Sequence, residues 1–106
     1  MKITITAQAA KSGTLRIWLS KIPQSSNSVY AFRLDDHGKI TDQVAHATIY
    51  GAGTGSRARE RTMLLFRFPP QVGIAPPHAG EELGLYLDAP DGKGYMDANF
   101  DIVSVE

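Results

Sequence analysis

The sequence predicts a single all-β domain, residues 1–106, folded as an antiparallel β-sandwich of the jelly-roll or Greek-key type. Apolar and polar residues alternate with a period of two in seven segments, whereas a helical period fits one segment at most. Turn-forming residues separate these segments about every dozen residues. The 106 residues suffice for one core, and because no cysteine is present that core must be held by packing without disulfides.

Seven strands are expected along the chain because one side of each segment is apolar. They cover residues 3–7, 15–20, 29–34, 39–50, 62–68, 83–87 and 95–105. Their alternating apolar rows are Ile3, Ile5 and Ala7; Leu15, Ile17 and Leu19; Tyr30, Phe32 and Leu34; Leu64, Phe66 and Phe68; and Leu83, Leu85 and Leu87. The fourth segment is less regular than the others.

Two segments carry further local signals. In the seventh strand the apolar phase changes after Ile102, so that Val103 and Val105 continue it, and this pattern is typical of a β-bulge or a change of burial. Residues 56–66 are the one helix candidate, because Ser56 could cap a helix. The extended alternative is favoured there, since Phe66-Arg67-Phe68-Pro69 follows.

The zero net charge hides two oppositely charged parts. Ten bases and four acids precede residue 81, whereas seven acids and one base follow from there to the end. Such segregation indicates that electrostatics matters in folding or in meeting a partner. Nucleic acid is an unfavoured partner, because a neutral chain of pI 6.8 lacks a broad basic surface.

Outward-facing aromatic and basic residues are the candidate partner-binding residues. If Leu15, Ile17 and Leu19 face the core, Trp18 and Arg16 point outward, and by the same argument Tyr86 points outward from its own strand. An exposed tryptophan beside arginine is typical of a protein-interface anchor or of a sugar-stacking platform. A row of arginines able to grip carboxylates or phosphates completes the set: Arg57, Arg59, Arg61 and Arg67. The alternative is that this row is solvated or pairs with the acidic C-terminal segment.

No metal or other cofactor is expected, with one alternative. Asp97, Asn99 and Asp101 would share one side of an extended strand, and their oxygen atoms would suit calcium. A strand row spreads these ligands over about 13 Å, however, which is too far for all of them to reach one ion. We therefore expect no tight calcium binding unless a bulge or the loop after Asp88 closes the site.

The chain carries no apolar run long enough for a membrane span and no secretory leader at its start, so it is expected to stay in the cytoplasm if it is full length. No serine, histidine and acid can be paired into a catalytic triad, and the three histidines fit no metal motif. The sequence therefore predicts a binding protein rather than an enzyme.

Three runs resemble a known family over the C-terminal part of the chain, about 45 residues in all. They are Met63-Leu64-Leu65-Phe66-Arg67-Phe68-Pro69-Pro70, Glu82-Leu83-Gly84-Leu85-Tyr86-Leu87-Asp88-Ala89-Pro90 and Phe100-Asp101-Ile102-Val103-Ser104-Val105. This pattern is similar to the closing strands of galactose-binding-like jelly rolls, which include many carbohydrate-binding modules. The resemblance implies a sandwich fold and, as the alternative function, glycan binding with or without calcium. The first half of the chain matches no such pattern.

Taken together, the residues favour a non-catalytic module that binds another protein, as an accessory, inhibitor or virion-type component. The carbohydrate-binding jelly roll is the alternative.

Overall fold

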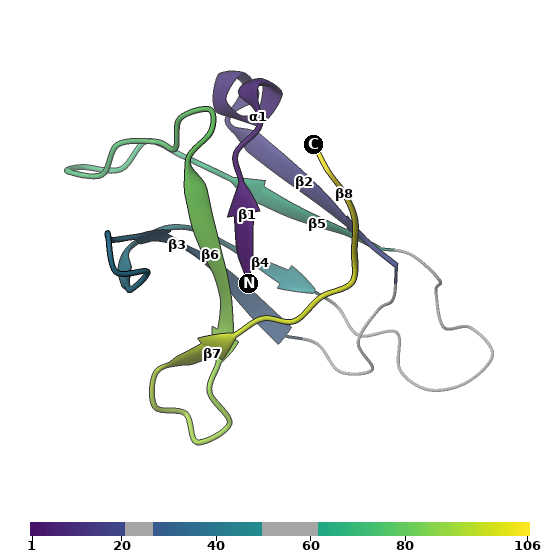
Figure 1. Ribbon diagram of the computed structural model, residues 1–106, viewed down its shortest axis with the longest axis vertical. Helices are drawn as coiled ribbons and strands as arrows, with labels where there is room; N and C mark the ends of the chain where they lie inside the picture. Colours follow the sequence, from purple (N-terminus) through teal and green to yellow (C-terminus); the bar gives the residue numbers. More distant parts are fainter. Residues whose placement is uncertain (21–26, 50–61) are drawn as a thin grey trace.

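The computed structural model describes residues 1–20, 27–49 and 62–106, which form two antiparallel sheets around a shared core (Figure 1). The five-stranded sheet has the order β1-β6-β3-β4, and β7 pairs with β6; the three-stranded sheet has the order β5-β2-β8. The elements are β1 Lys2–Thr4, α1 Ala7–Ser12, β2 Thr14–Leu19, β3 Asn27–Leu34, β4 Ile40–Ile49, β5 Thr62–Arg67, β6 Glu82–Asp88, β7 Tyr95–Asp97 and β8 Ile102–Val105. This architecture confirms the predicted all-β sandwich. In the described ranges, no helix has the length and apolar character that crossing a membrane requires.

The core lies between the sheets and is built from one apolar row per strand. Leu15, Ile17 and Leu19 of β2 are fully buried, as the alternation predicts. They lie beside Leu64 and Phe66 of β5 in the same sheet, and Leu83 and Leu85 of β6 from the other sheet complete the cluster. Because each fully buried large apolar side chain contributes about 1.5–3 kcal/mol, this shared layer holds the two sheets together.

Strand β3 is apolar on both of its sides, and the row that faces the core is not the expected one of Tyr30, Phe32 and Leu34 but the smaller Val29 and Ala31. Val29 and Ala31 are fully buried there. Tyr30 and Phe32 project from the opposite, outer side of the sheet, paired with Tyr86 and Gly84 of β6. The bulkier row of this strand is therefore placed outside the sandwich core.

The first expected strand is shorter than the sequence predicts, because a six-residue helix replaces its end. Thr6 Oγ1 accepts a hydrogen bond from the Ala9 N–H (3.0 Å) and caps the first turn of α1. Gly13 ends the helix with φ +76°, a left-handed conformation that glycine adopts without a side-chain clash. This turn carries the chain from β1 in one sheet to β2 in the other.

The expected strand over 95–105 is wrong as one continuous element, because the chain changes sheets within it. β7 pairs with β6, whereas β8 pairs with β2, and residues 98–101 connect the two sheets (Figure 1). The predicted bulge is confirmed: Trp18 is paired with Ser104 but Leu19 with Ile102, which leaves Val103 as the extra residue. In the helix candidate over 56–66, Thr62 to Phe66 belong to β5, and the residues before Thr62 lie outside the described part of the chain.

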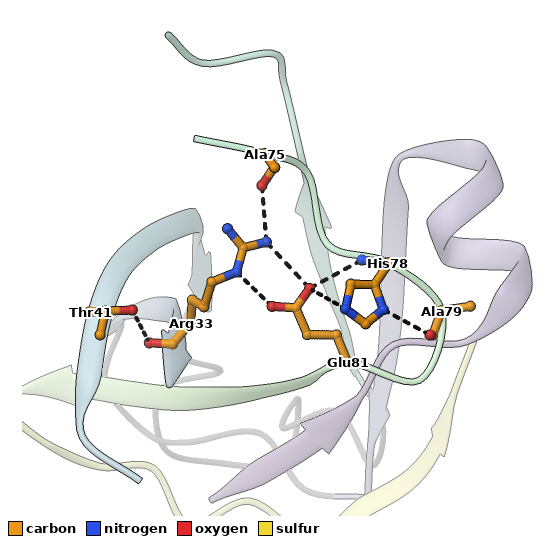
Figure 2. Close-up of polar contacts among 6 residues, drawn as sticks. All are labelled: Arg33, Thr41, Ala75, His78, Ala79 and Glu81. Atoms are coloured by element: carbon orange, nitrogen blue, oxygen red, sulfur yellow. Dashed lines mark hydrogen bonds and ion pairs between the residues drawn. The ribbon is translucent and has the colours of Figure 1, made fainter. Parts of the chain in front are cut away.

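An ion pair fastens the connection between β5 and β6 to the five-stranded sheet (Figure 2). Arg33 of β3 donates hydrogen bonds to both carboxylate oxygens of Glu81, at 2.6 Å and 3.3 Å, and to the Ala75 carbonyl at 3.0 Å. Glu81 also accepts a hydrogen bond from the His78 backbone N–H at 3.2 Å. The Glu81 side chain is only 13% exposed, so this fork is partly desolvated.

We expect Glu81→Gln to lower the free energy of unfolding by about 1.5–3 kcal/mol, because it leaves the Arg33 guanidinium without its anion. Burial by itself would raise the pKa of Glu81, but the hydrogen bonds from Arg33 and from the His78 N–H outweigh it and hold the pKa below its ordinary value of 4.5. The stabilisation is therefore present above about pH 4.5 and is lost as the pH falls through the pKa of the folded state.

Urea denaturation at several pH values checks this expectation. The difference between wild type and Glu81→Gln should shrink as the pH is lowered below about 4.5. The matched control is Glu82→Gln, a change of the same chemistry at the exposed neighbouring residue, and it should cost under about 0.5 kcal/mol. Equal effects of the two changes would contradict the role of the Arg33–Glu81 pair.

Candidate functional site

The outer side of the three-stranded sheet carries the first candidate surface, here called the tryptophan face. Cross-strand pairing places Trp18 opposite Met63 and Arg16 opposite Leu65, so these side chains emerge on the same side. The residues of the tryptophan face are Arg16, Trp18, Met63, Leu65, Arg67 and Val103. Leu15, Ile17 and Leu19 occupy the other side of β2, as the sequence predicts.

Apolar side chains on the tryptophan face remain open to solvent. Met63 is 38% exposed and Val103 is 46% exposed, while Trp18 is partly exposed. A shallow hollow beside the indole is lined by Trp18, Val103, Ser104 and Glu106. The bulge at Val103 positions this valine at the rim of the hollow, because it adds an unpaired residue to β8 beside Trp18.

Two arginines lie at one end of this apolar surface, toward Thr14. Arg16 and Arg67 are both exposed and lie diagonally across β2 and β5, since Arg67 is paired with Thr14, two residues before Arg16. Within the described part of the chain, neither arginine forms an ion pair. The acidic C-terminal segment instead supplies Glu81 to Arg33, a residue outside the predicted arginine row.

The outer side of the five-stranded sheet carries a second surface, the tyrosine face, formed by Tyr30, Phe32, Tyr86 and Tyr95. Phe32 lies at its centre, with its ring centroid 4.9 Å from that of Tyr95 and 5.8 Å from that of Tyr86, both in edge-to-face arrangements. Tyr30 contacts Tyr95 at 5.1 Å and Phe32 at 6.3 Å. Phe32 is 5% exposed as a result, whereas Tyr95 is 42% exposed.

Carboxylates border the tyrosine rings. The Tyr30 hydroxyl donates a hydrogen bond to Asp88 Oδ2 at 3.1 Å, and this bond, which needs the neutral phenol, raises the pKa of Tyr30. Burial raises the pKa of Tyr86, and the charge of nearby Asp97 raises it further. Asp97 Oδ1 in turn lies 3.3 Å from the α-amino group of Met1, which holds this carboxylate beside the junction of β1 and β7.

The tyrosine face requires glycine at position 84. A Cβ atom on Gly84 would lie 2.6 Å from Cε2 of Tyr86 and 3.1 Å from Cδ2 of Leu34. The Tyr86 ring thus covers the backbone of its own strand where the glycine leaves room for it. Packing an aromatic ring over a strand glycine compensates for the missing side chain.

The structure brings together three of the predicted partner-binding residues and separates a fourth. Arg16, Trp18 and Arg67 share the tryptophan face, but Tyr86 belongs to the other sheet and faces away from them. Tyr86 and Trp18 therefore cannot form one site. Arg57, Arg59 and Arg61 lie outside the described residues.

The predicted row of oxygen ligands for calcium does not exist as one strand face. Asp97 ends β7, whereas Asn99 and Asp101 lie in the connection to β8. Asp97 is engaged by the Met1 amine, and the Asp101 carbonyl accepts a hydrogen bond from the Ser20 N–H at 2.9 Å. Over the described ranges, no three acidic, histidine or cysteine side chains gather closely enough to hold a metal ion.

Sequence reasoning missed three members of the tyrosine face: Tyr30, Phe32 and Tyr95. The available signal was that β3 is apolar in both phases, which indicates that both sides of that strand are covered. The chain position of Tyr95, after a glycine-rich turn, gave no indication of its neighbours. Pairing of β7 with β6 brings it opposite Asp88 and over Phe32.

No family model, no curated protein and no solved structure matches the chain.

We expect Gly84→Ala to lower the free energy of unfolding by about 1–3 kcal/mol, because the added methyl group must displace the Tyr86 ring. The same change in a Tyr86→Ala background should cost clearly less, since the obstructing ring is gone. Chemical denaturation of the four proteins of this double-mutant cycle measures the difference. An equal cost in both backgrounds would show that the ring does not restrict position 84.

Proposed function

We propose that the protein is a non-catalytic interaction module that binds a partner protein through the tryptophan face. One observation carries the proposal: a partly exposed tryptophan lies among exposed Met63 and Val103, and toward the Thr14 end of the same face lie two arginines that have no ion-pair partner in the described ranges. Tryptophan and arginine are the residues most enriched among those that dominate binding energy at protein interfaces. Methionine is likewise enriched there, and lysine is depleted.

A difference in exposure between the two faces supports the same proposal. On the tyrosine face the central ring, that of Phe32, is already covered by neighbouring tyrosines, so much of the apolar area of this face is buried within the chain. On the tryptophan face the apolar side chains of Met63 and Val103 remain 38% and 46% exposed. Burial of these groups on binding would remove apolar area from water, and the arginines at one end of the face would select a partner with carboxylates at the matching margin.

Glycan binding is a second candidate, and the tyrosine face favours it. Tyr95 exposes 42% of its surface beside Asp88, and aromatic rings bordered by carboxylates are suited to stack on sugar rings and accept hydrogen bonds from hydroxyl groups. The resemblance of the C-terminal strands to galactose-binding-like jelly rolls points the same way. A glycan array probed with wild type and Tyr95→Ala tests this candidate, and binding that Tyr95→Ala abolishes would support it.

A photo-activatable amino acid at position 103 tests the lead proposal directly. Expressed in the cells from which the protein comes, this variant should cross-link a defined partner, and excess unlabelled wild type should compete the product away. The matched control carries the same amino acid at His37, which is exposed in the turn after β3. Identical products from both positions would contradict a specific tryptophan face.

Once cross-linking has identified the partner, we expect Trp18→Ala to weaken binding of that partner by about 2 kcal/mol or more, as loss of an interface anchor does. The cost to folding should stay below the ~3–5 kcal/mol of a buried aromatic, because Trp18 lies outside the core cluster. Calorimetry measures the first effect and thermal unfolding the second. Met96→Ala, which removes an apolar side chain that is 41% exposed on β7, is the control that should leave partner binding unchanged.

Trp18 also reports binding in wild type, because it is the chain's only tryptophan. Its emission should shift to shorter wavelength when the partner is added and should become less accessible to quenchers. An unchanged spectrum in a saturated complex would exclude the tryptophan face as the binding surface.

A further inference from the structure

The two outer faces of the sandwich carry opposite charge. On the tryptophan face Arg16 and Arg67 are exposed, and Glu106, which exchanges two backbone hydrogen bonds with Arg16 across β2 and β8, offsets one of these charges. On the outer side of β6 and β7, the exposed acids are Glu82, Asp88 and Asp97. Lys2 and the Met1 amine offset part of this negative charge, but both lie toward β1, away from Asp88 and Tyr95.

The faces also have complementary shapes, because one carries an exposed ring and the other a shallow hollow. Tyr95 is the most exposed ring of the tyrosine face, at 42%, and it stands opposite Asp88 on the neighbouring strand. The tryptophan face is hollowed between Trp18, Val103 and Ser104. Arg16 lies two residues from Trp18 on the same side of β2, roughly 6.6 Å along the strand, whereas cross-strand partners such as Tyr95 and Asp88 lie roughly 4.5–5.5 Å apart; the long Arg16 side chain can span the difference.

We infer that a second copy of this chain is a partner of the tryptophan face, with the tyrosine face of one copy docked on the tryptophan face of the next. Tyr95 of one copy fills the hollow beside Trp18 of the other, and Asp88 meets Arg16. This inference rests on the proposed function, because it uses the same binding surface. It adds the identity of the occupant and the surface that the occupant presents.

Charge decides between this arrangement and a twofold dimer. Two tryptophan faces would each present Arg16 and Arg67 with one acid, Glu106, and two tyrosine faces would each present Asp88 and its neighbouring acids, so pairing like faces opposes surfaces of the same net sign. Like charges across an interface are unfavourable, whereas the unlike faces attract. A contact between two different faces leaves one of each kind free at the ends, so it continues into an open chain of molecules instead of closing as a dimer.

Sedimentation velocity of the whole chain over a range of concentrations tests the inference. The mean mass should rise with concentration beyond that of a dimer, and the association should weaken at high salt because charged groups contribute to it. A monomer at every concentration and salt, or a limiting dimer, would overturn the inference. If the chain is monomeric while Trp18→Ala still abolishes binding of the cross-linked partner, the proposed function stands and only self-association fails.

Two exposed positions give a complementation test that a twofold dimer cannot pass. Val103→Glu places an acid on the tryptophan face, and Tyr95→Ser removes the ring that enters the hollow. Both positions are more than two-fifths exposed, so both variants should fold, which thermal unfolding verifies. Each variant alone should be monomeric where wild type associates, whereas their equimolar mixture should form a dimer and nothing larger.

A charge exchange checks the proposed pairing of Arg16 with Asp88. Arg16→Glu and Asp88→Arg should each raise the dissociation constant of self-association by about tenfold or more. The double variant should regain most of the lost affinity, because each molecule then offers the exchanged pair in the opposite sense. Lys39→Glu, an exposed change of charge in the turn after β3, is the control and should have no effect. Failure of the double variant to recover would contradict this register.

Discussion

Burial of one apolar row per strand between two sheets is the constraint on which the rest of this structure depends. β2, β5 and β6 direct leucine, isoleucine and phenylalanine side chains into that layer. The chain must then pass repeatedly between the sheets, and α1 and residues 98–101 are two of the connections that it uses. Because side chains alternate along a strand, fixing the inner row also fixes which residues face outward.

The outer faces then differ in how much of their apolar area the chain itself covers. Phe32 on the tyrosine face is enclosed by three tyrosines, and the Tyr86 ring fills the space above Gly84. This surface behaves as a small second core that stabilises the sheet, with Tyr95 at its exposed margin. The tryptophan face has a hollow beside its indole and two exposed arginines, and its apolar side chains Met63 and Val103 stay open to solvent.

The charge segregation along the sequence is partly reproduced on the two outer faces of the sandwich. The acidic C-terminal part supplies β6 and β7 of the five-stranded sheet, and one of its acids, Glu81, forms an ion pair with Arg33 (Figure 2). The others on β6 and β7 border the tyrosine rings, while Arg16 and Arg67 lie on the opposite layer. The two layers of the sandwich therefore present chemically different surfaces, which is the physical basis for proposing both a partner and an orientation.

Period-two alternation by itself determined the sandwich class, the inner rows of β2, β5 and β6, the outward position of Trp18 and the irregularity at Val103. Each of these follows from neighbours one or two residues away, because the pleat alternates sides and a bulge shifts the phase. Only the tertiary structure decided that Trp18 and Tyr86 lie on opposite layers, that the last expected strand divides between two sheets, and that Tyr30, Phe32 and Tyr95 meet. Those outcomes depend on which strands pair and on where the chain crosses, and such contacts join residues as far as 88 positions apart in the sequence, as in the pair of Ile17 with Val105.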